Sequence, residues 1–206
     1  MIVKNFIRKS WVLTFEMFLI VGLGNPGKSY RNNRHNIGYK IIDNIRKVYD
    51  FPEFSKKFKS EFSKSKLNKN ILFLLKPTTF MNNSGIALKE IKSFYNININ
   101  NIYVIHDEID LDQGRVKVKN GGSHNGHNGL KSIDELIGKN YNRVRVGVSR
   151  PSKIYEENID ENISNWVLSD FTSNEKDKWL DNTINYVSKM IISLINSQNG
   201  FCGKNV

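Results

Sequence analysis

The fold of this chain is decided by the stretch Phe18-Leu19-Ile20-Val21-Gly22-Leu23-Gly24-Asn25-Pro26-Gly27-Lys28-Ser29. Its first four residues are apolar and predict a buried strand. From Gly22 onward the letters satisfy both G-x-G-x-x-G and G-x-x-x-x-G-K-[ST], two patterns of phosphate-binding loops. In both patterns a helix must begin at the last glycine, so that its free N–H groups face the phosphate.

That helix is not expected here. The residues after Ser29 have no apolar face, and the apolar helical period begins only at Ile37. We therefore predict a polar loop that carries Asn25, Tyr30 and His35 over the end of a sheet. Open α/β folds place ligands and catalytic groups at that position.

Strands and helices alternate along the rest of the chain, which predicts an α/β fold. The expected elements are a helix over 37–48, a hairpin of 61–66 and 71–76, a helix over 86–95, strands at 102–105, 115–119 and 144–148, a helix that follows the glycine-rich run 121–129, and a long amphipathic helix over 179–195. Residues 150–165 are polar, and we expect them to be irregular and to form no domain boundary.

Length and composition suit one domain with a sizeable core. No apolar stretch approaches the roughly 18 residues needed to cross a bilayer. The single cysteine, Cys202, cannot form an internal disulfide, which suits a reducing compartment and a cytoplasmic protein. Residues 1–16 read either as a targeting segment or as an extension from a start assigned upstream of Met17; we favour the second.

The charge is unevenly distributed. Residues 1–150 hold 26 Lys and Arg against 12 Asp and Glu, whereas residues 151–206 hold 5 against 8. The strand Arg115-Val116-Lys117-Val118-Lys119 places its three cations on one face, and Arg143 and Arg145 repeat that spacing. A basic body with two cationic rows suggests a polyanionic partner such as a nucleic acid.

Histidine, asparagine and aspartate gather at strand ends, in residues 25–36, 76–85, 105–110 and 120–130. One reading is a metal site that uses His124 and His127 with His106 and Asp107. The neighbouring glycines indicate a loop rather than a rigid ligand pair, and no cysteine lies nearby, so we disfavour it. A P-loop nucleotidase is the second reading, since residues 102–108 resemble a Walker B strand; the missing helix after Ser29 is the objection.

The third reading is hydrolysis with a histidine base. Imidazole titrates near neutral pH and works better when a carboxylate orients it, for which Asp107 is a candidate. His106 and Asp107 are adjacent in a strand and point to opposite faces, so both cannot line one pocket. No Ser or Cys occupies a nucleophile motif, which favours direct attack by water. Asparagine side chains could stabilise the developing oxyanion.

A set of motifs from Met17 onward carries a family resemblance through its order and spacing. The motifs are V-G-L-G-N-P-G at 21–27, Tyr30 with R-H-N at 34–36, P-T-T-F-M-N at 77–82, H-D-E-I-D at 106–110, G-H-N-G-L at 126–130, R-V-R-V-G at 143–147 and V-L at 167–168. In this combination the chain resembles the bacterial-type peptidyl-tRNA hydrolases. Two departures are the polar run Gly122-Ser123-His124-Asn125-Gly126 and the leader before Met17.

The resemblance implies a monomeric single domain over residues 17–206, with a mixed, mostly parallel twisted sheet flanked by helices on both faces. It implies cofactor-free, metal-independent cleavage of the ester between a peptide and the 3′-terminal ribose of tRNA, which recycles tRNA. P-loop nucleotidase is kept as the alternative. An inactive tRNA-binding module is disfavoured because His35 and Asp107 are both present.

The resemblance also assigns residues. His35 matches the catalytic base, Asp107 its stabilising carboxylate, and Asn25 the position that distinguishes blocked from free aminoacyl groups. Substrate contacts are implied for Tyr30, Phe80, Asn82 and Asn128, and contacts with the phosphates of the tRNA acceptor stem and 3′ end for Lys117, Lys119 and Arg145.

Overall fold

The computed structural model describes residues 15–151 and 158–198. Within these residues, the strands form one sheet in the order β2-β3-β4-β1-β5-β7-β6. Their bounds are β1 Glu16–Gly22, β2 Ser55–Lys57, β3 Ser60–Leu67, β4 Asn70–Pro77, β5 Ile102–Glu108, β6 Val116–Asn120 and β7 Asn142–Gly147. Strands β4, β1, β5 and β7 run parallel, whereas β3 and β6 are antiparallel to their neighbours. The sheet is therefore mixed, with a parallel centre.

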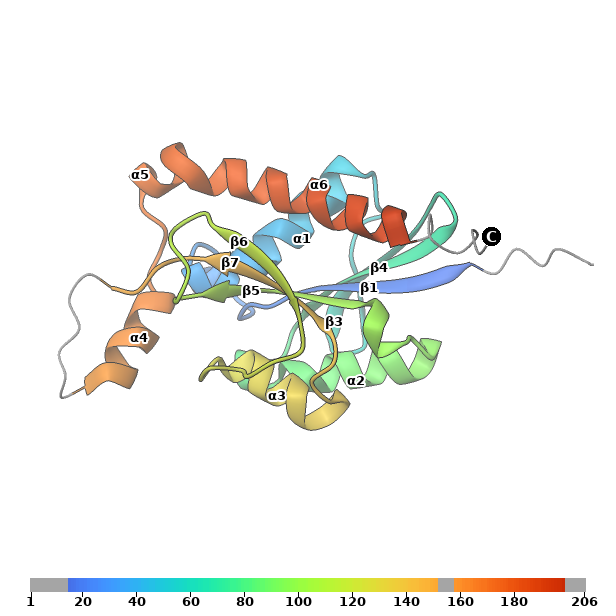
Figure 1. Ribbon diagram of the computed structural model, residues 1–206, viewed down its shortest axis with the longest axis horizontal. Helices are drawn as coiled ribbons and strands as arrows, with labels where there is room; N and C mark the ends of the chain where they lie inside the picture. Colours follow the sequence, from blue (N-terminus) through green and yellow to red (C-terminus); the bar gives the residue numbers. More distant parts are fainter. Residues whose placement is uncertain (1–14, 152–157, 199–206) are drawn as a thin grey trace, which may run out of the picture.

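Helices cover both faces of this sheet (Figure 1). One face carries α1 (Ile37–Val48) and α6 (Asp181–Gln198), which pack on each other; the other carries α2 (Ser84–Tyr95) and α3 (Asn128–Ile137). Two further helices, α4 (Ile159–Val167) and α5 (Ser173–Glu175), lie beyond one end of the central strands (Figure 1). The predicted α/β fold with helices on both faces is confirmed.

The apolar run of β1 is explained by this layered arrangement. Phe18 and Ile20 belong to the hydrophobic cluster on the α1–α6 face, while Leu19 and Val21 belong to the cluster on the α2–α3 face. All four are fully buried. A strand buried on both faces needs apolar residues at every position rather than at alternate ones.

Close packing at the end of β1 determines where the first helix begins. A Cβ atom on Gly22 would overlap the carbonyl oxygen of Gly38, and one on Gly38 would overlap the backbone of Leu23. Helix α1 therefore lies directly against the strand end. The backbone N–H of Leu23 also donates to the carbonyl of Ile105 in β5, at 2.9 Å. These contacts fix both ends of the loop between β1 and α1.

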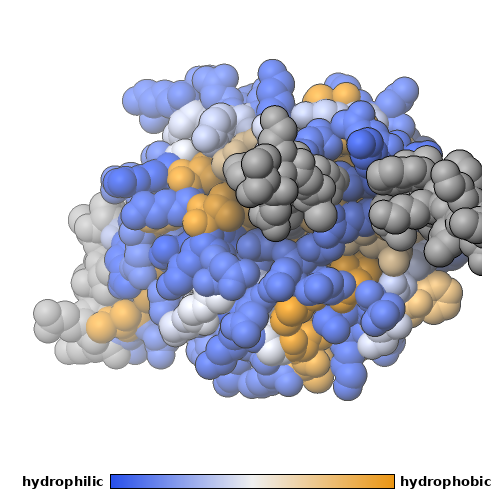
Figure 2. Space-filling view, turned by 45° about the vertical axis from the view of Figure 1, so that its right-hand side comes forward, coloured by the Kyte–Doolittle hydropathy of each residue, from blue (hydrophilic) through white to orange (hydrophobic). Residues whose placement is uncertain are grey.

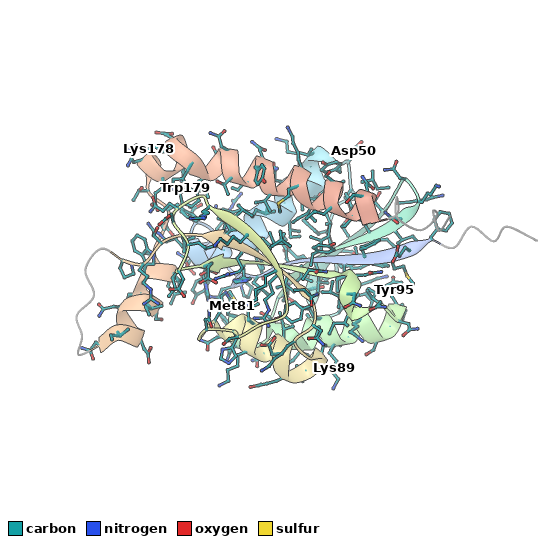
Figure 3. The ribbon with its side chains drawn as sticks, viewed as in Figure 1. Asp50, Met81, Lys89, Tyr95, Lys178 and Trp179 are labelled. Carbon is teal, nitrogen blue, oxygen red and sulfur yellow. The ribbon has the colours of Figure 1, made fainter. Side chains whose placement is uncertain are left out.

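Some expectations about element bounds were wrong. Residues 150–165 are not wholly irregular, because α4 begins at Ile159 and brings Ile163 and Val167 toward the sheet end. Strand β1 begins at Glu16, so Met17 lies inside the strand rather than before it. The expected long C-terminal helix begins with a π-helical segment, Lys176–Leu180, in which Lys178 points outward and Trp179 toward the sheet (Figure 3).

Other expectations lie outside the described residues, namely most of the leader and Cys202. Among the helices that are described, none combines the length and apolar character needed to cross a membrane. Hydrophilic residues cover most of the face shown in Figure 2, and hydrophobic ones form only small separate patches there.

Candidate active site

The loop between β1 and α1 is closed by a reciprocal pair of asparagines. The backbone N–H of Asn25 donates to Oδ1 of Asn36, and Nδ2 of Asn36 donates to the carbonyl of Asn25, both at 2.9 Å. Between them the chain makes two short 3-10 turns, Lys28–Tyr30 and Arg34–Asn36, and the α-helix starts at Ile37. The helix that a phosphate-binding loop would require after Gly27 is thus replaced by a 3-10 turn.

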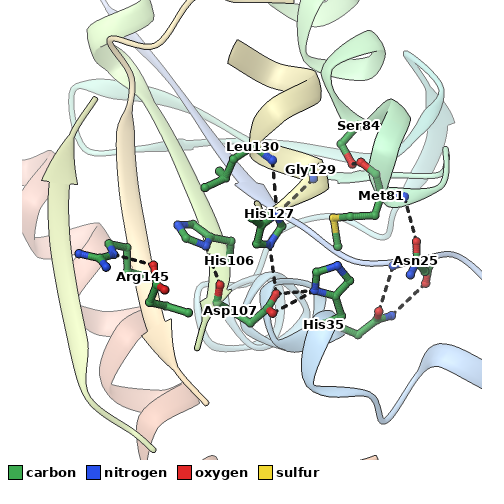
Figure 4. Close-up of polar contacts among 12 residues, drawn as sticks. Asn25, His35, Met81, Ser84, His106, Asp107, His127, Gly129, Leu130 and Arg145 are labelled. Atoms are coloured by element: carbon green, nitrogen blue, oxygen red, sulfur yellow. Dashed lines mark hydrogen bonds and ion pairs between the residues drawn. The ribbon is translucent and has the colours of Figure 1, made fainter. Parts of the chain in front are cut away.

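His35 projects from this loop toward the end of β5. Its Nδ1 lies 2.8 Å from Oδ1 and 3.0 Å from Oδ2 of Asp107 (Figure 4). Because an ionised carboxylate only accepts hydrogen bonds, Nδ1 carries the proton and donates it. The other ring nitrogen, Nε2, then bears a lone pair, so the neutral ring can accept a proton there.

A second histidine shares the same carboxylate. Nε2 of His127 lies 3.2 Å from Oδ1 of Asp107, and Nδ1 of His127 accepts the backbone N–H groups of Gly129 and Leu130 at 3.1 and 3.4 Å. An atom that accepts these N–H groups has no hydrogen of its own, so the proton of the neutral ring is on Nε2. His127 thereby caps α3 and donates to Asp107 (Figure 4).

Asp107 remains ionised in this setting although it is almost fully buried. Burial alone would raise the pKa of the carboxyl group, but the imidazoles of His35 and His127, by charge and by hydrogen bonds, hold that pKa well below its usual range. A carboxylate at this position orients His35 and stabilises the imidazolium that forms when the ring accepts a proton.

His106, the neighbour of Asp107, serves a different role. Its Nδ1 donates to the carbonyl of Asp107 at 2.7 Å, and its ring packs edge-on against His127 with centroids 5.1 Å apart. Burial, followed by the positive charge that His127 carries when it is protonated, lowers the pKa of His106 to about 3. His106 is therefore neutral, and it is absent from the lining of the cleft to which Asp107 contributes. The prediction that these two residues do not share one pocket is confirmed.

Asn25 is oriented by a main-chain group. Its Oδ1 accepts the backbone N–H of Met81 at 2.9 Å, and the residue is 7% exposed. One lone pair of the oxygen is thereby committed, which fixes the amide so that Nδ2 is the donor it offers to a ligand. A ligand that needs both a donor and an acceptor from this side chain has to use Nδ2 and the remaining lone pair of Oδ1.

These groups surround a cleft of about 640 Å³ at the end of the sheet. Of the ten residues to which the family resemblance assigns a role, the structure brings six to its lining: Asn25, His35, Phe80, Asn82, Asp107 and Asn128. The polar run 124–127 lines it too, and α4 supplies a further wall. Tyr30 is not part of this lining; its ring meets Phe80 edge-on, with centroids 6.4 Å apart.

The cationic residues lie to one side of the cleft. Lys117 and Lys119 are exposed on the edge strand β6, and Lys117 is the cross-strand partner of Arg145. Nε of Arg145 donates to Oε2 of Glu108 at 2.9 Å, so this charge is partly balanced. Arg143 is 2% exposed and bonds to Asp134 and to the carbonyl of Ser123. The prediction of a second exposed cationic row is therefore wrong for Arg143, which is buried.

Sequence reasoning missed the structural roles of several residues in this site. His127 occupies a helix N-cap, a position that usually holds Ser, Thr, Asp or Asn, so no cap signal marked it. Asn36 was named only as part of the R-H-N motif, and its place before a predicted helix did not reveal its hydrogen bonds with Asn25. The Thr172–Glu175 capping box, which follows α4, does have a readable T-x-x-E pattern.

Three of the groups could in principle hold a metal. Ligand atoms of His35, Asp107 and His127 lie within 4.8 Å of one another. This set differs from the His124–His127 pair considered from the sequence. In the structure, however, Asp107 accepts hydrogen bonds from both rings, and a metal would have to displace those protons.

Comparisons with known proteins show the family of this chain. Residues 19–203 match the model of the peptidyl-tRNA hydrolase family. The peptidyl-tRNA hydrolase of Bartonella henselae is 48% identical over 179 residues, which cover 87% of this chain and 89% of that protein. The one from Rickettsia bellii (strain RML369-C) is 48% identical over 161 residues, 77% of this chain and 83% of that protein.

Solved structures show the same relationship. The crystal structure of peptidyl-tRNA hydrolase from Acinetobacter baumannii matches with a TM-score of 0.80 at 34% identity, covering 89% of this chain and 91% of that one. The fold is a single α/β domain with a mixed, mostly parallel sheet, and the relatives that it matches are hydrolases. The chain belongs to the peptidyl-tRNA hydrolase family, and its reaction is the hydrolysis of peptidyl-tRNA.

Proposed function

We propose that His35 is the general base of this reaction. The observation that carries the proposal is the 2.8 Å contact of its Nδ1 with Asp107, which leaves Nε2 as the basic atom beside the cleft. Nε2 takes a proton from water while the water oxygen attacks the ester carbonyl carbon. The tetrahedral intermediate then expels the ribose oxygen, which receives the proton from His35.

Asp107 stabilises the imidazolium formed in the first step. His127 donates to the same carboxylate through a ring whose orientation is fixed by α3, so it holds Asp107 in place. The side-chain amides of Asn82 and Asn128, at the cleft, supply N–H donors for the developing oxyanion and for the substrate. Asn25 contacts the peptide bond next to the ester.

The acceptor stem and 3′ end of the tRNA lie on the β6 side, where Lys117, Lys119 and Arg145 contact phosphates. The protein acts as a monomer, which light scattering coupled to size-exclusion chromatography would test. Since its substrate is a product of translation, we place it in the cytoplasm, a location that fractionation of cells expressing a tagged chain would test. No metal ion takes part, because the proposed base is activated by a carboxylate.

The test is hydrolysis of N-acetyl-aminoacyl-tRNA by His35→Ala. We expect kcat to fall by about 10²–10⁴-fold, the usual loss for a general base, with KM little changed. His124→Ala is the matched control, since His124 lines the same cleft but its ring accepts a hydrogen bond from the N–H of Gly126 instead of contacting Asp107. Asp107→Asn should give an intermediate loss, because the ring keeps a hydrogen-bond partner and loses a charge.

Equal losses in His35→Ala and His124→Ala would remove His35 from its assigned role. Addition of a chelator to the wild-type reaction tests the metal separately. Activity that is lost with chelator and restored by a divalent ion would replace the proposed base with a metal-bound water.

A further inference from the structure

A second cleft lies behind the loop that carries His35. It has a volume of about 650 Å³ and is bounded by the loop, by α1, by the ends of β3 and β4, and by the start of the C-terminal helical segment. Asn25 lines both this cleft and the catalytic one. The loop is therefore a wall shared by two cavities, with Asn25 at their boundary.

This second cleft carries a group of cations that take part in none of the ion pairs of the described residues. Lys28, Arg31, Lys40 and Lys176 all line it, and none of them forms an ion pair with another described residue. Within the part of the chain that the structure describes, these side chains make one hydrogen bond, from Nζ of Lys40 to Oδ1 of Asn32 at 3.2 Å. We call these four residues the Lys40 cluster.

The rest of the cleft is different. Lys76 is almost buried and lies 2.6 Å from carboxylate oxygens of both Asp43 and Glu61. Its charge is fully balanced within the protein. The Lys40 cluster is thus a local excess of positive charge and not a general property of the cleft.

The cations of the cluster are close enough to affect one another. Burial, followed by the charges of Lys176 and Arg31, holds the pKa of Lys40 below its usual value, and the charges of Asp43 and Asp170 offset this only in part. A bound anion would offset both the burial and the repulsion. The cluster is therefore suited to a negatively charged ligand.

The position of the cleft relative to the ester indicates which part of the substrate reaches it. The cationic strand β6 lies beyond β5 and β7 on one side of β1, whereas the second cleft lies on the β3–β4 side. The ester joins tRNA to peptide, so the two leave the reacting carbon in different directions. With tRNA toward β6, the peptide leaves past Asn25 toward the second cleft.

We propose that the second cleft binds the peptide part of the substrate and that the Lys40 cluster favours acidic side chains there. This inference rests on the proposed contact of Asn25 with the peptide bond beside the ester. An extended chain advances about 3.3 Å per residue, so the residues preceding the esterified one enter the cleft. Each ion pair at such a part-exposed site contributes modestly, and two of them together give a preference of about three- to tenfold.

A peptide fits this cleft better than an RNA strand does. Asp43, Glu61 and Asp181 also line it, and carboxylates repel a phosphate backbone. Tyr39, Leu180 and Ile184 add apolar surface next to the charges. A mixed apolar, acidic and basic lining suits side chains of a polypeptide, with acidic ones directed to the Lys40 cluster.

The test compares two substrates on the same tRNA, N-acetyl-Asp-Asp-Phe-tRNA and N-acetyl-Asn-Asn-Phe-tRNA, which differ in charge and hardly in shape. We expect the wild-type protein to have a kcat/KM about three- to tenfold higher for the acidic one at low salt. Lys40→Gln combined with Lys176→Gln should bring that ratio close to one. Lys47→Gln combined with Lys189→Gln, exposed residues of α1 and α6 outside the cleft, removes the same charge and should preserve the ratio.

A wild-type ratio of one, or an equal fall of the ratio in both double variants, would overturn the proposal. A smaller salt dependence of KM for both substrates in the Lys40 and Lys176 variant alone would overturn it in favour of tRNA phosphates. A failure of the proposed mechanism would be distinguishable from this result, because His35→Ala would then hydrolyse both substrates at the wild-type rate. Melting temperatures of the two double variants exclude a folding defect as the cause.

Discussion

The proton positions of the His35–Asp107–His127 group follow from neighbouring main-chain groups. His127 accepts two N–H groups at the start of α3, and this leaves its remaining N–H for Asp107. Asp107 in turn accepts the N–H of His35 and exposes the basic nitrogen of that ring. The start of α3 therefore fixes the proton of His127, and the carboxylate of Asp107 fixes that of His35.

Asn25 gives a prediction about substrate choice. In Asn25→Asp one carboxylate oxygen can still accept from Met81, and the other replaces the Nδ2 donor with a negative charge. That charge favours the ammonium group of free aminoacyl-tRNA and repels a peptide carbonyl. We expect the ratio of kcat/KM for aminoacyl-tRNA to that for N-acetyl-aminoacyl-tRNA to rise at least tenfold. An unchanged ratio, measured with one tRNA carrying both groups, would reduce Asn25 to a structural role.

His106 gives a prediction about acid stability. Its pKa is about 3 in the folded protein, where the ring is buried, against 6.5 for an unperturbed histidine. The unfolded chain therefore binds a proton first, and the free energy of unfolding falls as the pH drops from about 6.5 to 3, by up to about 1.4 kcal/mol per pH unit. Above pH 6.5 this contribution is complete.

His106→Asn keeps a donor for the carbonyl of Asp107 and cannot titrate. Urea unfolding at several pH values measures the free energy of unfolding of the wild-type protein and of His106→Asn. The difference between the two free energies should shrink as the pH falls. A difference that stays constant between pH 7 and pH 4 would mean that His106 binds its proton as readily in the folded state as in the unfolded chain.

For single residues, the sequence predicted which side chains meet at the cleft and missed the groups that orient them. His35, Asp107 and Asn25 were predicted because they stand in recognisable motifs at strand ends, and the structure brings them to one cleft. The partners that orient them, the ring of His127 and the amide of Asn36, depend on which groups meet in three dimensions. No spacing in the chain encodes those meetings.

Among the elements, the C-terminal wall of the catalytic cleft is attached to the loop by Arg34. Its guanidinium bonds to Glu175 at 2.7 Å and to Ser169, and stacks 3.7 Å from the centre of the Trp166 ring. Both charged residues are buried. The residue before His35 thus connects the loop to the segment that holds α4.

Arg34→Met should lower the free energy of unfolding by about 3–5 kcal/mol, because the buried carboxylate of Glu175 would lose its cation and keep only hydrogen bonds from Thr172 and Gln113. Arg46→Met is the control. Arg46 pairs with Glu53, which is 84% exposed, and exposed pairs contribute at most about 1 kcal/mol. Chemical denaturation measures both, and similar losses would show that the buried pair has no special weight.

The edge strand β6 gives a prediction about tRNA binding. Lys117→Gln with Lys119→Gln should raise KM, with kcat retained, and lower the salt slope of tRNA binding by roughly one unit per lost phosphate contact or less. Lys56→Gln with Lys57→Gln removes the same charge from β2 at the opposite edge of the sheet. Equal effects of the two double variants would mean that tRNA responds only to net charge.

For the whole molecule, the order of elements was predictable because each strand and helix has its own hydrophobic period. The start of α4 was not predicted, because its sequence is mostly polar and its few apolar residues form a packing face only beside the cleft. Similarly, Arg143 looked like a surface cation because strand alternation places it beside Arg145. It is buried because Asp134 of α3 lies within reach, a contact that alternation cannot reveal.

The closed loop between Asn25 and Asn36 has an evolutionary consequence. Its ends are joined by Asn25 and Asn36, and Arg34 ties it to Glu175 and Ser169, so the shape of the loop depends little on the exposed side chains of Lys28 and Arg31. Substitutions at Lys28 and Arg31 can therefore accumulate in descendants of this protein without displacing His35, and with them the charge of the second cleft can drift. Lineages would inherit an unaltered reaction while the preference for its substrates diverges.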